Sequence, residues 1–219
     1  MSAETVSVVE GDGAVARKAL ERTIAAGGVA LFPADGLYGL ACDPLNGAAI
    51  ARIHEIKGRD DGKPSAVMYF SPLAMRELLG SLGERSRGAI GVLLPGPVTA
   101  VVANPEHRYP LACRSDPERL GLRLLGGPLA GAMCPIFQTS ANRSGEPAPT
   151  AFAEVDPAIA AAVDLAIDGG ELTGAPSTVI DLSAVEEGGG WRLLRAGGLE
   201  QGRATELLET VQIARNEAG

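Results

Sequence analysis

Three cationic side chains, Lys57, Arg59 and Lys63, stand within seven residues of an otherwise acidic chain. Glycines and a proline interrupt the segment from Lys57 to Pro64, which predicts a loop. Cations on such a loop can clamp phosphate oxygens, and a guanidinium suits two-point contact with an anion. The alternative is a solvated basic turn, neutralised by the two aspartates that lie between the cations.

Small hydroxyl and amide side chains form a second candidate, in the segment Thr139-Ser140-Ala-Asn142-Arg-Ser-Gly145. An apolar run at 135–139 predicts a strand that ends where these residues begin. The carboxyl ends of strands are where open α/β sheets bind ligands, and serine and asparagine can bind them without burying a charge. No G-x-S-x-G motif surrounds either serine, so a hydrolase triad is not supported. The alternative is an ordinary polar turn.

Two further segments join glycine to polar or charged residues. In the first, Asp168-Gly-Gly170 is followed by Gly174-Ala-Pro-Ser177 and a strand-like run to Asp181. A glycine-rich loop of this kind can present backbone N–H groups to an anion, although alone it is more often only a loop. In the second, Arg195-Ala-Gly-Gly198 places a cation at a strand end.

Residues Gly11-Asp-Gly13-Ala-Val-Ala16 match the dinucleotide fingerprint G-x-G-x-x-A between a strand and a helix. Asp12 would place a carboxylate beside the pyrophosphate, and the alternative is a turn that starts a helix. The run from Gly58 to Ser65 resembles a phosphate-binding P-loop, but it is one residue short, and Pro64 removes a backbone N–H that the loop needs.

The composition limits what the whole chain can do. Its 219 residues, 46% hydrophobic and 21% charged, suit one globular α/β domain. A formal net charge of −8 excludes nucleic-acid binding by the overall field, but a local basic groove stays open. Three cysteines without a C-x-x-C, and only two histidines, argue against a disulfide framework or a metal site. No leader or apolar span of about 18 residues is present, so we expect a cytoplasmic protein with no membrane partner.

The elements that must position these residues alternate along the chain. Gly27-Gly28 ends a first helix, Asn46 caps a second, and Pro72 begins a third. The pattern predicts helices at 15–26, 48–56, 72–79, 85–94 and 205–213, and strands at 5–9, 29–32, 65–70, 98–103, 120–125, 135–139, 163–167, 178–182 and 191–194. We expect one domain over residues 1–219, with its core at about 13–199 and a C-terminal helix at about 204–214. Its sheet mixes parallel and antiparallel strands between flanking helices.

The order of these segments resembles the YrdC/YwlC/YciO family, whose best-known members are threonylcarbamoyl-AMP synthases. The resemblance runs from about Gly27 to Leu199. It rests on Gly27-Gly-Val-Ala-Leu-Phe-Pro33, Tyr38-Gly-Leu40, Lys57-Gly-Arg59, Pro95-Gly-Pro-Val-Thr99, Gly121-Leu-Arg123, Ser140-Ala-Asn142-Arg-Ser-Gly145, Asp168-Gly-Gly170, Ser177-Thr-Val-Ile-Asp181 and Leu194-Arg195.

The resemblance implies a twisted mixed α/β sheet around a concave cavity. It also implies a nucleotidyltransferase that makes L-threonylcarbamoyladenylate and pyrophosphate from threonine, bicarbonate and ATP, with Mg²⁺ expected on the phosphates. The product would serve tRNA threonylcarbamoyladenosine modification through partner proteins. The residues that match the family's site are Lys57 and Arg59 for catalysis; Arg59, Lys63, Ser140, Asn142 and Arg195 for ATP; and Tyr38, Arg123, Ser140 and Ser177 for the amino acid.

The chain departs from the family pattern where P-T-[ED]-T is usual, because it has Pro33-Ala34-Asp35-Gly36 and so lacks both threonine hydroxyls. Asp60, Ala148 and Ala196 are further departures. Because hydrogen-bond donors discriminate among small polar substrates, a synthase for a different amino acid stays open. So do a non-synthase paralogue that binds a nucleotide or double-stranded RNA, and an NAD-dependent oxidoreductase built on the Gly11–Ala16 segment.

Overall fold

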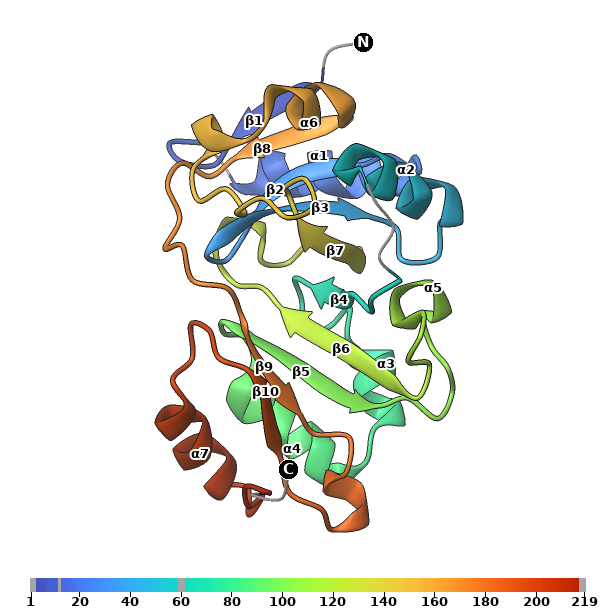
Figure 1. Cartoon of the computed structure of the whole chain (residues 1–219), viewed down its shortest axis with the longest axis vertical. Helices are drawn as coiled ribbons and strands as arrows, with labels where there is room; N and C mark the ends of the chain where they lie inside the picture. Colours follow the sequence, from blue (N-terminus) through green and yellow to red (C-terminus); the bar gives the residue numbers. More distant parts are fainter. Residues whose placement is uncertain (1–2, 12, 59–61, 217–219) are drawn as a thin grey trace.

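The computed structural model describes residues 3–11, 13–58 and 62–216. Within them the chain forms one ten-stranded sheet in the order β1-β8-β2-β3-β7-β4-β6-β5-β9-β10 (Figure 1). The strands are β1 (Glu4–Ser7), β2 (Ala30–Ala34), β3 (Leu37–Cys42), β4 (Ala66–Tyr69), β5 (Val98–Ala103), β6 (Arg119–Leu124), β7 (Ile136–Ser140), β8 (Leu165–Asp168), β9 (Thr178–Asp181) and β10 (Arg192–Arg195).

The helices are α1 (Gly13–Ala25), α2 (Gly47–Lys57), α3 (Arg76–Ser81), α4 (Glu84–Leu93), α5 (Pro110–Cys113), α6 (Pro157–Ala162) and α7 (Gln201–Glu209), with 3₁₀ turns at Gly127–Leu129, Phe152–Glu154 and Val185–Glu187. No helix in the part of the chain that the structure describes is both long enough and apolar enough to span a membrane.

The sheet mixes both kinds of strand pairing, as the sequence predicts. β1 and β2 lie parallel to β8, β4 lies parallel to β6, and β5 lies parallel to β9. The pairs β2–β3, β3–β7, β4–β7, β5–β6 and β9–β10 are antiparallel. The chain enters each half of the sheet twice: β1 to β3, β7 and β8 form one half, and β4 to β6, β9 and β10 form the other. The connection from β8 to β9 returns the chain to the second half along the left side of Figure 1.

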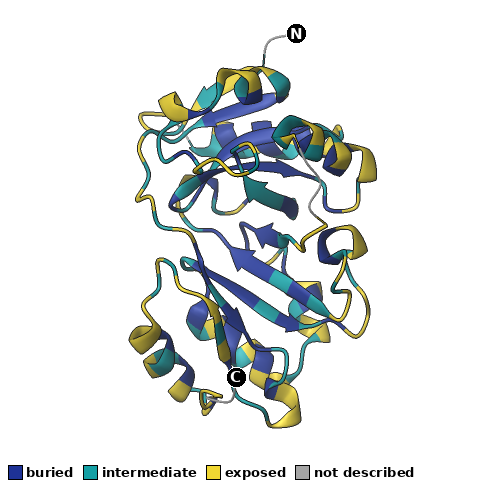
Figure 2. Ribbon diagram, in the orientation of Figure 1, coloured by how far each residue is buried: buried dark blue, intermediate teal, exposed yellow. Residues whose placement is uncertain are grey.

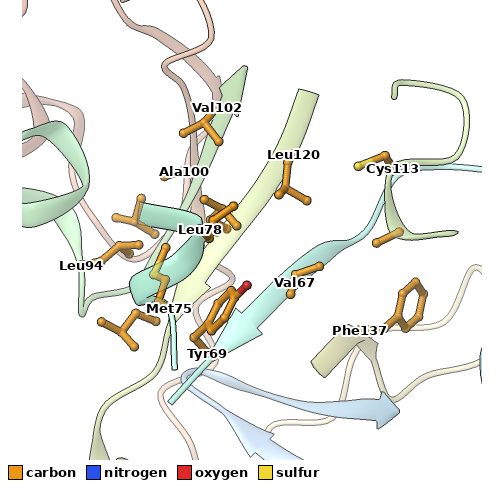
Figure 3. Packing of buried hydrophobic residues seen from close by; sticks show 14 of the residues in the cluster. Val67, Tyr69, Met75, Leu78, Leu94, Ala100, Val102, Cys113, Leu120 and Phe137 are labelled. Atoms are coloured by element: carbon orange, nitrogen blue, oxygen red, sulfur yellow. The ribbon is translucent and has the colours of Figure 1, made fainter. Parts of the chain in front are cut away.

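Two clusters of buried side chains hold the helices on the sheet. Alternate residues of one strand point to opposite faces, so in β2 Ala30 and Phe32 join the cluster that includes α1, whereas Leu31 joins the cluster that includes α2. Figure 2 shows buried strands between helices that expose their outer faces. In the second half of the sheet, the helices among the described residues pack in this way on one face, and the cavity described below opens on the other. Figure 3 shows that cover, with residues of β4, β5 and β6 packed against the segment from Met75 to Leu94.

Local signals in the sequence account for several boundaries. Asn46 caps α2 because its side-chain oxygen accepts a hydrogen bond from the backbone N–H of Ala49 at 3.1 Å. Gly58 ends the same helix in the left-handed conformation, with φ 74°. Gly27, two residues after the end of α1, has φ 75°, and glycine adopts this conformation with the least strain. The predictions that Asn46 caps a helix and that Gly27-Gly28 ends one are therefore confirmed.

Other predictions need correction. Pro72 begins a turn instead of a helix: Ser71 Oγ accepts the Leu73 N–H at 3.2 Å, and α3 begins only at Arg76. The C-terminal helix occupies Gln201–Glu209 instead of 205–213. Ala204 and Leu208 are its buried residues, and a turn follows it at 210–212. The sequence pattern also missed α5, α6 and β3. β3 is as buried as the strands that the pattern identified, but Gly39, a residue type disfavoured in strands, interrupts its apolar run.

Candidate functional site

A cavity of about 610 Å³ opens on the uncovered face of the second half of the sheet. The two-residue period of the strands decides which side chains face it. In β6 Leu120 and Leu122 enter the core, while Gly121 and Arg123 line the cavity. β5, β9, β10, the end of β7 and the β2–β3 hairpin supply further walls. Of the residues proposed from the sequence, Tyr38, Arg123, Ser140, Asn142, Ser177 and Arg195 all line this cavity.

Lys57 fixes the polar turn at the end of β7. It is the last residue of α2, and its Nζ donates hydrogen bonds to the backbone oxygens of Ser140 and of Asn142, the latter at 2.9 Å. Ser140 Oγ donates to Asn142 Oδ1, and Asn142 Nδ2 donates to the Glu146 carbonyl at 2.7 Å. The three residues proposed from two distant segments therefore form one hydrogen-bonded unit.

Arg123 forms a buried ion pair at the wall of the cavity. Its side chain is only 7% exposed and donates to Asp35 Oδ2 through Nη2 and to Gln138 Oε1 through Nη1, at 3.2 Å for the second. Burial lowers the pKa of Arg123, although Asp35 counteracts this shift, and burial raises the pKa of Asp35 despite the nearby guanidinium. Nε of Arg123 is buried and has no hydrogen-bond partner among the described residues. The two contacts of the guanidinium therefore leave one of its N–H donors unsatisfied.

A second arginine lines the cavity together with two hydroxyl groups. Arg195 Nη2 donates to the backbone oxygen of Ser177 at 2.8 Å and to Ser177 Oγ at 3.0 Å. Ser177 Oγ also lies 2.8 Å from Thr99 Oγ1, which joins β5 to the residue that precedes β9. An irregularity in β10 shifts the register so that Arg195 pairs with Val179. Burial lowers the pKa of Arg195.

The remaining proposed residues are Tyr38, Lys63 and Arg59, and their positions differ from those of the residues above. Tyr38 is fully buried, and its hydroxyl donates to the Gly170 carbonyl and accepts from the Gly169 N–H, both at 2.9 Å. It thereby anchors the Asp168-Gly-Gly170 segment against β3, while its other atoms reach the cavity wall. Lys63 is exposed and is not among the residues that line the cavity. Arg59 falls outside the described residues, so its role stays a prediction.

Sequence reasoning did not single out several polar residues of this wall. Gln138 in β7 contacts Arg123, and Thr99 in β5 contacts Ser177. The sequence analysis included Thr99 only as part of the Pro95–Thr99 motif and gave it no role. Asp116 and Arg119 form a further ion pair at one edge, at 2.6 Å. The signal for Arg119 was the spacing of Arg119, Gly121 and Arg123, which places three residues on one face of a strand. Among the described residues, three arginines therefore line the cavity of a chain with negative net charge.

The dinucleotide-like segment is used in packing. A Cβ on Gly13 would lie 2.5 Å from the Pro128 carbonyl oxygen, and one on Gly11 would lie 2.1 Å from the Ser7 carbonyl oxygen. Both glycines therefore permit close backbone approach within the fold, and Asp12 lies outside the described residues. Among the described residues no group of three or more His, Cys, Asp or Glu could hold a metal ion. Cys42, Cys113 and Cys134 are free thiols.

Comparison with known proteins finds relatives in one family. The family model Sua5/YciO/YrdC, described as "Telomere recombination", matches residues 22–197. Curated relatives named threonylcarbamoyl-AMP synthase include one from Xanthomonas axonopodis pv. citri, 33% identical over 68% of this chain and 85% of its own, and one from Nitrosococcus oceani, 32% identical over 68% and 82%.

Solved structures give the same result. The structure of P. abyssi Sua5 complexed with L-threonine has a TM-score of 0.78 and 28% identity, and the match covers 99% of this chain but 63% of the longer Sua5 chain. E. coli YciO shares the fold, with a TM-score of 0.75 over 91% of this chain and 98% of its own at 23% identity. The chain belongs to the Sua5/YciO/YrdC family.

Proposed function

We propose that this protein synthesises L-threonylcarbamoyladenylate from threonine, bicarbonate and ATP, with release of pyrophosphate, for the threonylcarbamoyladenosine modification of tRNA. The names of the curated relatives and the threonine bound to P. abyssi Sua5 support this proposal. A cytoplasmic location and partner proteins of tRNA modification are expected with this function.

The observation that carries the proposal is the meeting of separate motifs in one cavity. The turn that Lys57 holds, the buried Arg123 and the Ser177–Arg195 pair come from distant parts of the chain and face the same space of about 610 Å³. Formation of a carbamoyl adenylate brings two anions together, the carbamate and the α-phosphate. Fixed cations and oriented hydrogen-bond donors lower the cost of that approach, and the reaction needs no covalent nucleophile.

The wall suggests how the roles divide. Ser140, Asn142 and Arg195 would contact the nucleotide together with Arg59 and Lys63 from the basic loop, and Lys57 would assist by fixing the turn. Arg123 and Ser177 would contact the amino acid, with Tyr38 and Ser140 beside them. Mg²⁺ would arrive bound to the phosphates, since the described residues offer no cage for it.

The departures from the family pattern keep a synthase for a different amino acid as the second candidate. Ala34 lines the cavity, so a missing threonine hydroxyl at this position alters the site directly. Gly36 does not line it, and a Cβ there would lie 2.1 Å from the Ala175 carbonyl oxygen. The change at Gly36 is therefore explained by packing, whereas the change at Ala34 bears on specificity. A non-synthase paralogue that binds a nucleotide or RNA is the third candidate.

The test is pyrophosphate release from ATP and bicarbonate, with threonine present, omitted, or replaced by other amino acids. Threonine-dependent release is the expected result, and its loss on chelation of Mg²⁺ would support the role given to the metal. Release only with another amino acid would support the second candidate. Binding of ATP without any release would refute the synthase and favour the non-synthase paralogue.

A further inference from the structure

The loop at 196–199, which follows β10, folds back along the segment that leads into β9. The backbone N–H of Gly198 donates to the Pro176 carbonyl oxygen at 2.8 Å. A Cβ on Gly197 would lie 2.3 Å from the same oxygen and 2.4 Å from the carbonyl carbon of Ser177. The two backbones are therefore in direct contact, and the absence of a side chain at position 197 permits this approach.

The side chain of Thr178 fastens this loop. Its hydroxyl donates to the Leu199 carbonyl at 2.7 Å and accepts from the Leu199 N–H at 2.9 Å. One hydroxyl can do both, because it is a donor and an acceptor at once. Thr178 is fully buried, and it is the first residue of β9, where it pairs with Val98 of β5. The end of the loop is therefore tied to the sheet by a side chain in place of a strand partner.

Arg195 stands at the start of the loop that Thr178 fastens. Its guanidinium donates to the Ser177 carbonyl from Nε at 3.2 Å and from Nη2 at 2.8 Å, and Nη2 also donates to Ser177 Oγ at 3.0 Å. Ser177, which holds the guanidinium, directly precedes Thr178, which holds the loop. An arginine side chain loses considerable rotamer entropy when it is ordered, so these contacts reduce the cost of ordering it for a ligand.

The charge of Arg195 is not neutralised within the protein. Among the described residues its hydrogen bonds go to the carbonyl and the hydroxyl of Ser177, and no carboxylate forms an ion pair with it. Burial lowers the pKa of Arg195; burial also lowers the pKa of Arg123, and the charge of Arg195 adds to that second shift. Both arginines line the cavity. A ligand with negative charge would therefore relieve an unfavourable pair of like charges.

We propose that Thr178 is a positioning residue for the nucleotide: by fastening the loop at 196–199 it holds the guanidinium of Arg195 in the place where that group meets ATP. Thr178 is buried and does not line the cavity, so it acts through Arg195 and not on the ligand itself. This inference rests on the proposed function, because it takes ATP to be a substrate and Arg195 to contact it.

Three substitutions separate this role from a purely structural one. Thr178→Val keeps the shape of the side chain and removes the hydroxyl, so the two backbone groups of Leu199 lose their partner. Thr178→Ser keeps the hydroxyl and removes only the methyl group. Leu20→Ala is the control for general instability, because Leu20 is fully buried in the cluster that includes α1 and does not line the cavity.

The experiment measures the Kd of ATP by calorimetry, together with thermal melts and pyrophosphate release. In Thr178→Val the Kd of ATP should rise about tenfold, which corresponds to roughly one hydrogen bond to a charged group. Thr178→Ser should restore the affinity to within about threefold of the wild type, and Leu20→Ala should melt at a lower temperature with its ATP affinity unchanged within the same factor. In an Arg195→Ala background, Thr178→Val should change the Kd by less than about twofold, because the residue through which it acts is gone.

The possible outcomes distinguish the proposed function from the role of Thr178. A wild type that neither binds ATP nor releases pyrophosphate would refute the proposed function. ATP binding by the wild type with the same affinity in Thr178→Val, or an equal loss with and without Arg195, would refute only the positioning role. If Thr178→Val does not fold, hydrogen exchange of the wild type decides: the Leu199 amide should exchange more slowly than exposed loop amides, and equally fast exchange would overturn the inference.

Discussion

Gly36 occupies a position where a single added methyl group should disturb the protein. It follows Asp35 in the β2–β3 hairpin and is buried against the segment that leads from β8 to β9. A Cβ at Gly36 would lie 2.1 Å from the Ala175 carbonyl oxygen and 2.8 Å from Thr173 Oγ1. The Gly36 carbonyl also accepts a hydrogen bond from the Gly174 N–H at 2.9 Å. Gly36→Ala therefore forces two backbone segments apart.

The size of the effect follows from these distances. Ordinary van der Waals contact for a Cβ begins near 3.4 Å, so the methyl group and the Ala175 oxygen must separate by about 1.3 Å. Overpacking of this kind costs about 1–3 kcal/mol, and distortion of one backbone hydrogen bond adds about 1 kcal/mol. We therefore expect Gly36→Ala to reduce the free energy of unfolding by about 2–4 kcal/mol.

Chemical denaturation of matched variants measures this effect. Gly91→Ala is the control, because Gly91 is exposed in α4 and a Cβ there would meet no atom within 4 Å beyond its own helix. Alanine is favoured over glycine in helices, so the control should gain about 0.5–1 kcal/mol. The same substitution thus changes stability in opposite directions at the two positions. Equal stability of Gly36→Ala and the wild type would refute the reasoning.

Two further predictions concern buried polar contacts. Thr99→Val keeps the shape of the side chain but removes the hydroxyl beside Ser177. In chemical denaturation it should lower the free energy of unfolding by about 1 kcal/mol, and it should raise the KM for the amino acid or for ATP. Unchanged stability together with unchanged KM values would contradict the importance of this contact. Burial tends to raise the pKa of Asp181, but hydrogen bonds from Ser183 and the charge of Arg192 outweigh it and hold that pKa below its usual range. Its stabilising effect should therefore be complete above about pH 4 and fade as the pH falls through the lowered pKa. Thermal melts from pH 2.5 to 6 should show a weaker acid dependence in Asp181→Asn than in the wild type, and identical profiles would contradict this assignment.

Local signals made much of the fold predictable. Apolar runs of strand length identified most strands because these strands are buried, and Asn46 and Gly27 marked helix ends through their own side-chain or backbone chemistry. The β2–β3 hairpin was not predicted as such, because Gly39 interrupts the apolar run of its second strand and its turn was seen only as part of a motif. The prediction that Pro72 begins a helix was wrong because proline suits a turn as well as the start of a helix.

The membership of the site was more predictable than its contacts. Ser140, Asn142, Ser177 and Arg195 were proposed from local patterns or from resemblance, and all four line the cavity. The partnership of Arg123 with Asp35 joins residues 88 positions apart, and no local pattern encodes a contact of that range.

No local pattern encodes the contact between Gly36 and Ala175 either, although this contact explains why position 36 has no side chain. Such facts depend on how strands are ordered in the sheet, and the sequence leaves that order open.

The interleaved strand order also has a consequence for how the protein folds during its synthesis. β1 pairs with β8 across 161 residues, and β5 pairs with β9 across 80 residues. Contacts of such long range make folding slow, because the entropy of closing a long loop is lost before the strand pairing can stabilise the chain. During synthesis, the early strands of both halves emerge long before the partners that complete them. The cavity is therefore complete only after Ser177 and Arg195 have left the ribosome, and a chain that stops before β9 should have neither a complete sheet nor the complete cavity.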